Sequence, residues 1–189
     1  MQARRFEVSG VVEILPKRHG DERGYFTETF RDDWFRENVA DVTFFQENQS
    51  LSRSRGVLRG LHFQSHPSAQ GKLVRCISGA ILDVAVDIRH GSPTYGRHVA
   101  VTLTAEQGNQ LWIPVGFLHG FCTLTADVLI AYKVTAYYDP SADRGVLWND
   151  PDLAIAWPDF VDPALMSGKD RQQPLLRDLP HHFEYSGAE

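Results

Sequence analysis

Short apolar runs bounded by Gly, Pro, Asn or Asp follow one another along most of this 189-residue sequence. So many strand-like runs at regular spacing predict an all-β sandwich or barrel, of which the jelly roll is one form. Helical periodicity is scarce, and residues 32–39 are the segment that we expect to form a short amphipathic helix. The segments that we expect to be extended are residues 8–15, 25–30, 43–51, 56–63, 72–77, 81–88, 98–103, 109–113, 119–125 and 128–134.

The length and composition fit a single folded unit. A chain of this size can bury a sizeable core, and 42% hydrophobic and 23% charged residues are ordinary for a soluble globular protein. The sequence has no internal repeat, linker or low-complexity stretch. We therefore expect one domain over residues 1–189, with the polar tail from about residue 167 packing on it.

Charge and apolar patterning exclude two classes of partner. The formal net charge is −5 and no basic run occurs, so we expect no nucleic-acid surface. The N-terminus lacks a signal peptide and no apolar run approaches a membrane span, which predicts a cytoplasmic protein without a membrane partner. Cys76 and Cys122 lie in apolar runs, where we expect them to be buried rather than disulfide-bonded.

Residues 55–64 contain the first candidates for chemistry. His62 lies between apolar Leu61 and Phe63, with Arg59 just before them. We expect the side chains of Arg59 and His62 to share one face of a strand, where a base would stand beside a fixed cation. Such a pair suits proton abstraction from a carbon acid in an anionic substrate. A lone histidine is more often structural, so a catalytic role for His62 depends on the residues that accompany it.

Other polar residues also interrupt the strand-like apolar stretches. Lys72 opens one run, His119 opens another, and Tyr132 places a phenol within a third. Buried polar groups cost free energy unless they are hydrogen-bonded. Their recurrence therefore indicates a polar cavity in the mouth of the barrel.

Motifs for metals and cofactors are missing from the sequence. Metal-binding barrels of this kind use a His-x-His pair, but the residue two after His62 is Gln64, a poor ligand. His66 precedes Pro67 and is expected to lie off the strand. No dinucleotide fingerprint, phosphate loop, Gly-x-Ser-x-Gly or Cys-x-x-Cys motif occurs. We therefore expect acid–base chemistry by side chains alone, without metal or cofactor.

The chain resembles the dTDP-4-dehydrorhamnose 3,5-epimerases in a series of motifs that occur in order. These are Arg23-Gly24-Tyr25-Phe26, residues 55–64, Gly71-Lys72-Leu73-Val74-Arg75, residues 83–89, residues 91–96, Leu111-Trp112-Ile113-Pro114, Gly116-Phe117, His119-Gly120-Phe121, Tyr137-Tyr138, Trp148-Asn149-Asp150-Pro151 and Lys169-Asp170. The resemblance implies a cofactor-free cupin jelly roll with a few short peripheral helices, working as a homodimer. It also implies inversion of C3 and C5 of dTDP-4-dehydro-6-deoxy-D-glucose to give dTDP-4-dehydro-L-rhamnose, in dTDP-L-rhamnose biosynthesis.

The resemblance assigns catalytic roles to particular residues. His62 is expected to be the base, and Asp170 to hydrogen-bond its other ring nitrogen. Tyr132 matches the acid of the family. Lys72, together with His119, would stabilise the enolate oxygen.

The resemblance also implies a set of substrate-binding residues: Arg23, Phe26, Glu28, Glu47, Asn48, Arg59, Lys72, His119, Tyr138, Asp143 and Lys169. Arg23 and Arg59 suit the diphosphate, because a guanidinium offers paired donors. Tyr138 would stack on thymine, with Phe26 on the other side of the base. The dimer of the family implies that residues near Arg23 and Phe26 reach the pocket of the partner through an exchanged N-terminal strand.

The sequence departs from the family pattern at a few positions and leaves other functions open. Phe63 is often Tyr, Val115 is often Glu, and Gln49-Ser50-Leu51 is commonly His-Ser-Arg in the family. None of these departures removes a proposed catalytic group. The alternatives are an epimerase acting at C3 or C5 alone on a related dTDP-4-keto-deoxysugar, a metal-dependent cupin enzyme, and a sugar-nucleotide binding protein without catalysis.

Overall fold

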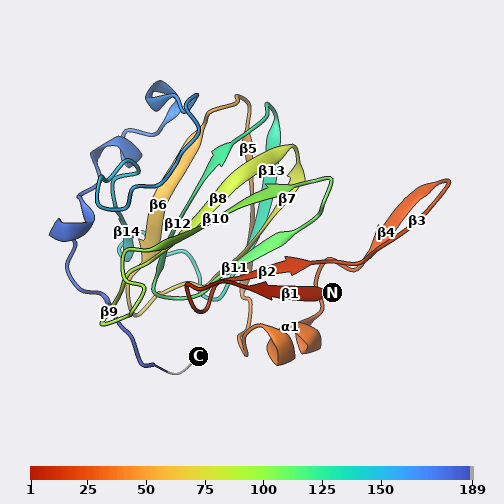
Figure 1. Ribbon diagram of the computed structural model, residues 1–189, viewed down its shortest axis with the longest axis horizontal. Coiled ribbons are helices and arrows are strands. Elements are labelled where there is room, and N and C mark those ends of the chain that lie inside the picture. Colours follow the sequence, from red (N-terminus) through yellow and green to blue (C-terminus); the bar gives the residue numbers. More distant parts are fainter. Residues whose placement is uncertain (188–189) are drawn as a thin grey trace.

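Two antiparallel sheets pack face to face in the computed structural model, which describes residues 1–187 (Figure 1). The first sheet runs in the order β1 (Gln2–Arg5), β2 (Val12–Leu15), β11 (Gln110–Ile113), β7 (Lys72–Ser78), β13 (Val128–Val134) and β5 (Gln46–Ser52). The second runs in the order β10 (His98–Thr104), β8 (Ala80–Asp87), β12 (Phe117–Thr123), β6 (Leu58–Gln64) and β14 (Asp143–Gly145). This arrangement confirms the expected all-β cupin jelly roll.

Smaller elements surround these sheets. The hairpin of β3 (Arg18–Asp21) and β4 (Gly24–Thr27) projects away from the body (Figure 1). β9 (Arg89–His90) pairs in parallel with β15 (Phe183–Glu184) near the C-terminus. The helices are short, as expected: α1 (Asp32–Asn38), η1 (Pro163–Leu165), η2 (Asp170–Gln172) and η3 (Leu176–Asp178). No helix within residues 1–187 is long and apolar enough to cross a membrane.

Alternating side chains of both sheets form the central core. In β10, Val99, Val101 and Leu103 are buried while the residues between them are more exposed, so one face of the strand packs inward. These side chains share a cluster with Val74 and Ile113 of the first sheet. Burial of this apolar surface is the main force that holds the two sheets together.

The C-terminal tail covers the outer face of the second sheet. Leu176 and Phe183 of the tail, together with Leu153 from the segment before it, pack against Val84 and Val86 of β8. Because β8 is covered on both faces, its sequence is a nearly continuous apolar run rather than an alternating one. The tail therefore makes part of the core. A single domain over residues 1–189 stays a prediction, since residues 188–189 lie outside the described part.

A third, aromatic cluster lies on the first sheet beneath α1. Phe35 from the helix meets Trp112 of β11 edge to face, with ring centroids 5.3 Å apart. Phe30 and Phe44 complete the cluster. The helix itself has Asp32 and Asp33 in its first turn, where their negative charges interact favourably with the positive end of the helix dipole.

Each segment that we expected to be extended contains or overlaps a strand, and residues 32–39 contain α1. Strand ends differ from expectation by a few residues, most of all in residues 8–11, which precede β2. The sequence did not reveal β1, β3, β9, β14 or β15. β1 is exposed along its whole length, so it carries no alternation of apolar and polar residues. Cys76 and Cys122 are free and buried, as expected.

Candidate active site

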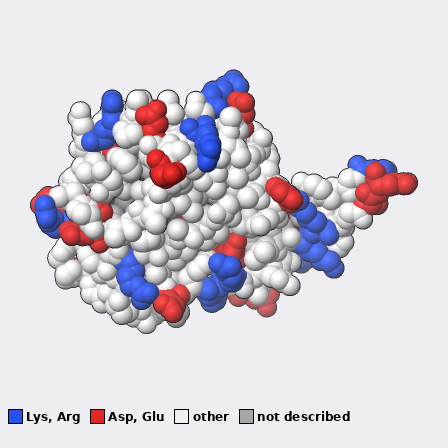
Figure 2. All heavy atoms as spheres, turned by 45° about the horizontal axis from the view of Figure 1, so that its top comes forward, with Lys and Arg blue, Asp and Glu red and all other residues white. Residues whose placement is uncertain are grey.

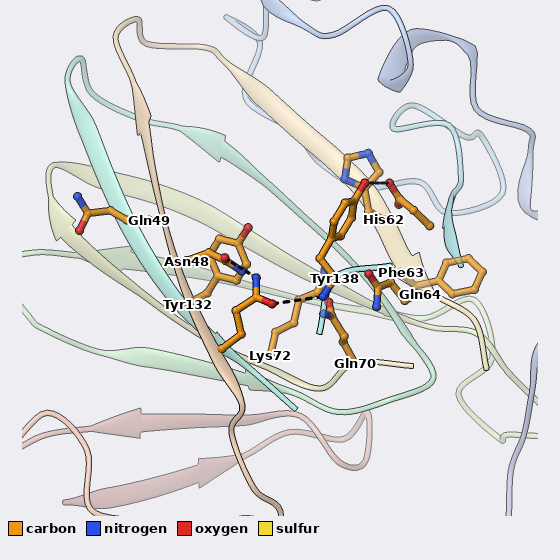
Figure 3. A pocket seen from close by; sticks show the side chains of 11 residues that line it. Asn48, Gln49, His62, Phe63, Gln64, Gln70, Lys72, Tyr132 and Tyr138 are labelled. Atoms are coloured by element: carbon orange, nitrogen blue, oxygen red, sulfur yellow. Dashed lines mark hydrogen bonds between the residues drawn. The ribbon is translucent and has the colours of Figure 1, made fainter. Parts of the chain in front are cut away.

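A polar cavity opens between the two sheets, in two hollows that share His62, Lys72 and Tyr132. One hollow has a volume of about 430 Å³ and the other about 320 Å³. The first is lined by Gln46, Asn48, Gln49, His62, Phe63, Gln64, Gln70, Lys72, Tyr132, Tyr138 and Asp143 (Figure 3). The second is lined by Ser50, Arg59, His62, Lys72, His119, Phe121, Ile130, Tyr132, Ser167, Lys169 and Asp170. The expected cavity is therefore present, and both sheets contribute to it.

An irregularity in β6 brings Arg59 and His62 into the same hollow. The two residues are three positions apart, so a regular strand would direct them to opposite faces. In the pairing with β12, however, His62 lies opposite His119 while Arg59 lies opposite Phe121. β6 therefore holds one extra residue, and such a bulge restores the common face. The two side chains therefore share one hollow, as we expected, but the bulge is the reason and not the regular geometry of a strand.

Gly60 makes this irregularity possible. Its φ is +124°, a conformation that residues with a Cβ rarely adopt. A Cβ at this position would lie 2.6 Å from the Cα of Gly120 and 2.8 Å from the carbonyl oxygen of His119. Glycine is thus required for the close approach of β6 to β12, which places His62 in the cavity.

His62 is paired with Asp170 from η2, which lies 108 residues further along the chain. The Nε2 atom of His62 is 2.7 Å from Oδ1 of Asp170, and the backbone N–H of Gly60 donates to Oδ2 at 3.4 Å. Desolvation acts to raise the pKa of Asp170, but its hydrogen bond and charge interaction with His62, together with hydrogen bonds from Ser167 and Gly60, leave the pKa below its ordinary value. Because the ionised carboxylate can only accept, Nε2 carries the proton and Nδ1 is left as the basic nitrogen.

A second histidine–aspartate pair lies beside the first. The Nε2 atom of His119 is 2.7 Å from Oδ1 of Asp83, and Asp83 is fully buried. Within residues 1–187, the Oδ2 atom of Asp83 has no hydrogen-bond partner. Sequence reasoning did not assign Asp83 a role. An acidic residue inside the apolar run of residues 81–88 was the signal, since a buried carboxylate needs a partner.

Lys72 and Tyr132 extend from the first sheet toward these histidines. Burial lowers the pKa of Lys72 to about 8, although Asp143 and Asp83 oppose the change. Burial raises the pKa of Tyr132, against the opposing effects of Arg59 and of the hydrogen bond to Asn48. At neutral pH the phenol therefore keeps its proton, and most of Lys72 is an ammonium ion.

Several of the expected binding residues lie at the cavity. Arg59 donates to Oγ of Ser52 at 3.3 Å, and Asn48 accepts from Nε2 of Gln46 at 2.7 Å. At the rim, the hydroxyl of Tyr138 donates to Asp143 at 3.3 Å, and Lys169 forms an ion pair with the same carboxylate. These contacts place Asn48, Arg59, His119, Tyr138, Asp143 and Lys169 around one cavity.

Four expected binding residues line neither hollow of their own chain. Arg23 and Phe26 belong to the projecting hairpin and Glu28 follows it; Arg23 pairs with Asp21 at 2.6 Å. Glu47 is adjacent to Asn48 in β5, so its side chain points to the other face of the sheet. There it forms an ion pair with Lys133 at 3.0 Å.

The part of the chain from residue 1 to 187 contains no group of three or more His, Cys, Asp or Glu side chains placed to hold a metal ion. Gln64, two residues after His62, is buried and hydrogen-bonded to backbone groups of the neighbouring loops.

The fold and the cavity together define a cupin-type protein with a polar site, lined by titratable side chains, in the mouth of a jelly roll. Residues 5–178 match the model of one family, described as dTDP-4-dehydrorhamnose 3,5-epimerase, and the chain belongs to that family. A protein of Sinorhizobium fredii with the same description is 54% identical over 185 residues, which cover 98% of this chain and 94% of the relative.

Solved structures agree with this membership. The crystal structure of the Legionella pneumophila enzyme in complex with dTDP-4-keto-L-rhamnose superposes with a TM-score of 0.91 at 42% identity, covering 98% of both chains. ChmJ of Streptomyces bikiniensis, a 3'-monoepimerase in complex with dTDP-quinovose, reaches a TM-score of 0.86 at 38% identity. That comparison covers 92% of this chain and 87% of ChmJ. The fold is thus shared by epimerases with different outcomes.

Proposed function

We propose that this protein epimerises dTDP-4-dehydro-6-deoxy-D-glucose at C3 and C5 to dTDP-4-dehydro-L-rhamnose, a step of dTDP-L-rhamnose biosynthesis. The His62–Asp170 pair, which shares a cavity with Tyr132 and Lys72, is the observation that carries the proposal. Membership of the family and the sugar nucleotide bound to the Legionella relative support the same substrate class. A cytoplasmic location, which the sequence predicts, belongs to the same proposal.

The pairing of His62 with Asp170 suits proton abstraction. The protons at C3 and C5 flank the C4 ketone, so removal of either one leaves an enolate. Nδ1 of His62 would take the proton, because Nε2 is already held by Asp170. The ionised carboxylate would then stabilise the imidazolium that forms.

Inversion requires a proton donor on the other side of the sugar ring. Tyr132 comes from β13 of the first sheet, whereas His62 comes from β6 of the second, and both line the same cavity. Its raised pKa keeps the phenol protonated and ready to donate. The two side chains would thus serve as base and acid from opposite sheets.

Lys72 and His119 would stabilise the negative charge that develops on the enolate oxygen. The pKa of Lys72 is about 8, so the ammonium form predominates below that pH. The positive charge is lost as the pH rises through 8. The buried carboxylate of Asp83 opposes that loss, because it favours the charged form of Lys72.

The rim of the cavity suits the nucleotide. Arg59 offers a guanidinium to the diphosphate, and the exposed ring of Tyr138 offers a face to thymine. Asn48, Asp143 and Lys169 supply further polar groups around the same opening.

We also propose a homodimer in which the N-terminal hairpin reaches the cavity of a second copy. The hairpin of β3 and β4 projects from the body and carries charges of both signs (Figures 1 and 2). Phe26 is 72% exposed, which is unusual for a large apolar side chain without a partner surface. In such a dimer, Arg23, Phe26 and Glu28 would bind substrate in the site of the partner.

Exchange of the hairpin predicts that two defective variants complement each other. One chain would carry Arg23→Ala and Phe26→Ala, and the other His62→Ala. Random pairing would make about half of the dimers mixed, and each mixed dimer would contain one intact site of its two. Co-expression is therefore expected to restore about a quarter of wild-type turnover. Activity no higher than that of the separate variants, in a sample shown by native mass spectrometry to contain mixed dimers, would refute the exchange.

The deciding experiment for the activity is incubation with dTDP-4-dehydro-6-deoxyglucose in deuterium oxide. We expect mass spectrometry and proton NMR to detect deuterium at both C3 and C5, in a product that a downstream reductase converts to dTDP-rhamnose. Deuterium at one carbon would instead indicate a single-centre epimerase, like the 3'-monoepimerase ChmJ. Nucleotide binding without exchange would indicate a binding protein, and exchange that a chelator abolishes would indicate a metal-dependent enzyme.

A further inference from the structure

Gln64 ends β6 two residues after His62, and the catalytic proposal gives it no role. It is 4% exposed and lines the first hollow. A buried amide costs free energy unless its donors and acceptor are satisfied, so its partners indicate what it does.

The amide of Gln64 bridges two loops at the rim of the cavity. Its Nε2 donates to the carbonyl oxygen of Ser68 at 2.6 Å and to that of Tyr137 at 3.1 Å. Its Oε1 accepts from the backbone N–H of Asp139 at 2.9 Å. The reverse orientation of the amide would set its oxygen against two carbonyl oxygens, so these partners define a single orientation.

The residue between the two backbone groups bound by Gln64 is Tyr138. Tyr138 is 58% exposed, so packing contributes little to the position of its ring. Its backbone N–H donates to Oε1 of Gln46 at 3.3 Å and its hydroxyl donates to Asp143 at 3.3 Å (Figure 3). Asp143 is also the β14 residue paired with Gln64. The location of the ring thus depends on polar bonds, and Gln64 holds the backbone on both sides of it.

We propose that Gln64 is a positioning residue for nucleotide binding, which holds the loop of residues 137–139 so that the Tyr138 ring stands ready to stack on the base. This inference rests on the proposed binding of a dTDP-sugar. A loop held in its binding conformation loses less entropy when the ligand arrives. Gln64 therefore contributes to the affinity for the nucleotide and not to the positions of the acid–base groups. His62 and Gln64 thus have separate roles although they belong to the same strand.

The test is a double-mutant cycle on the affinity for dTDP, measured by titration calorimetry. Gln64→Met keeps the approximate side-chain length and removes the donors and the acceptor. We expect Gln64→Met and Tyr138→Ala each to raise the Kd by about tenfold, and the double variant to bind no more weakly than Tyr138→Ala alone. In turnover assays, Gln64→Met is expected to raise KM while kcat changes less than about threefold.

Asn109→Leu is the matched control. Asn109 is also a buried amide, which donates to Glu13 at 2.7 Å and to the carbonyl oxygen of Thr102 at 2.9 Å, and accepts from the N–H of Thr104 at 3.1 Å. It lines neither hollow. We expect Asn109→Leu to lower the melting temperature without changing the Kd for dTDP. An equal rise in Kd in this control would show that general destabilisation, rather than loop position, explains the result.

The outcomes separate this inference from the proposed function. A wild-type protein that binds no dTDP would overturn both. Wild-type binding with additive effects of the two substitutions, or with unchanged affinity in Gln64→Met, would overturn the role of Gln64 alone. If Gln64→Met does not fold, Gln64→Glu takes its place in the cycle. Glutamate retains the oxygen that accepts from the N–H of Asp139, but it sets its other oxygen against the carbonyl oxygens of Ser68 and Tyr137.

Discussion

Replacement of His62 by alanine is expected to lower kcat by roughly 10²–10⁴-fold, the usual contribution of a general base. The substitution removes the one imidazole that is held by Asp170 and open to the cavity. The barrel should stay folded, because His62 is partly exposed and lies at the cavity wall. Loss of its partner leaves the carboxylate of Asp170 without its strongest hydrogen bond, at a cost of about 1–3 kcal/mol in the free energy of unfolding.

Turnover is measured by coupling the product to its reductase, and folding by circular dichroism and thermal unfolding. His66→Ala is a suitable control, since His66 is exposed and lines neither hollow. A folded His62→Ala protein with near-wild-type turnover would remove His62 from the mechanism.

The second large effect is expected from Tyr132→Phe, which deletes one hydroxyl and keeps the ring. The ring packs against the central core, so the fold should tolerate the change. In the proposed mechanism, proton abstraction by His62 does not need this hydroxyl, but reprotonation from the other side does. We therefore expect inversion to slow by roughly 10²–10⁴-fold, while isotope exchange into recovered substrate falls much less.

Deuterium uptake and product formation measured in the same sample give the ratio of exchange to inversion. Tyr185→Phe, a tyrosine that contacts Arg89 and lies outside both hollows, should behave as wild type. If exchange and inversion fall by the same factor in Tyr132→Phe, the hydroxyl does not act as the separate proton donor.

Local patterning explains why the strands could be predicted. A strand such as β10 shows apolar residues at every second position because one face meets the core. β1 and β14 were missed because they are short and polar at the edges of their sheets, where no burial pattern is imposed. Alternation could also have predicted the position of Glu47, since its neighbour Asn48 faces the cavity and adjacent side chains point to opposite faces.

The relation between Arg59 and His62 shows the limit of such patterns. Their spacing predicts opposite faces in a regular strand, and the extra residue in β6 reverses this. The bulge depends on the close approach of Gly60 to Gly120 in β12, a contact between strands far apart in the sequence. A bulge of this kind depends on pairing between strands, which local sequence does not reveal.

The sequence by itself determined the all-β class, the short helix α1, the buried free cysteines and the membership of an epimerase family. These properties follow from local alternation, from composition and from motifs in a given order. The family resemblance predicted the contact of Asp170 with His62, and the structure contains it. Only the tertiary structure decided that Asp83 meets His119 and that the Gln64 amide bonds to the backbone on both sides of Tyr138. Each of these contacts joins residues at least 36 positions apart, so each depends on how the two sheets and the tail pack.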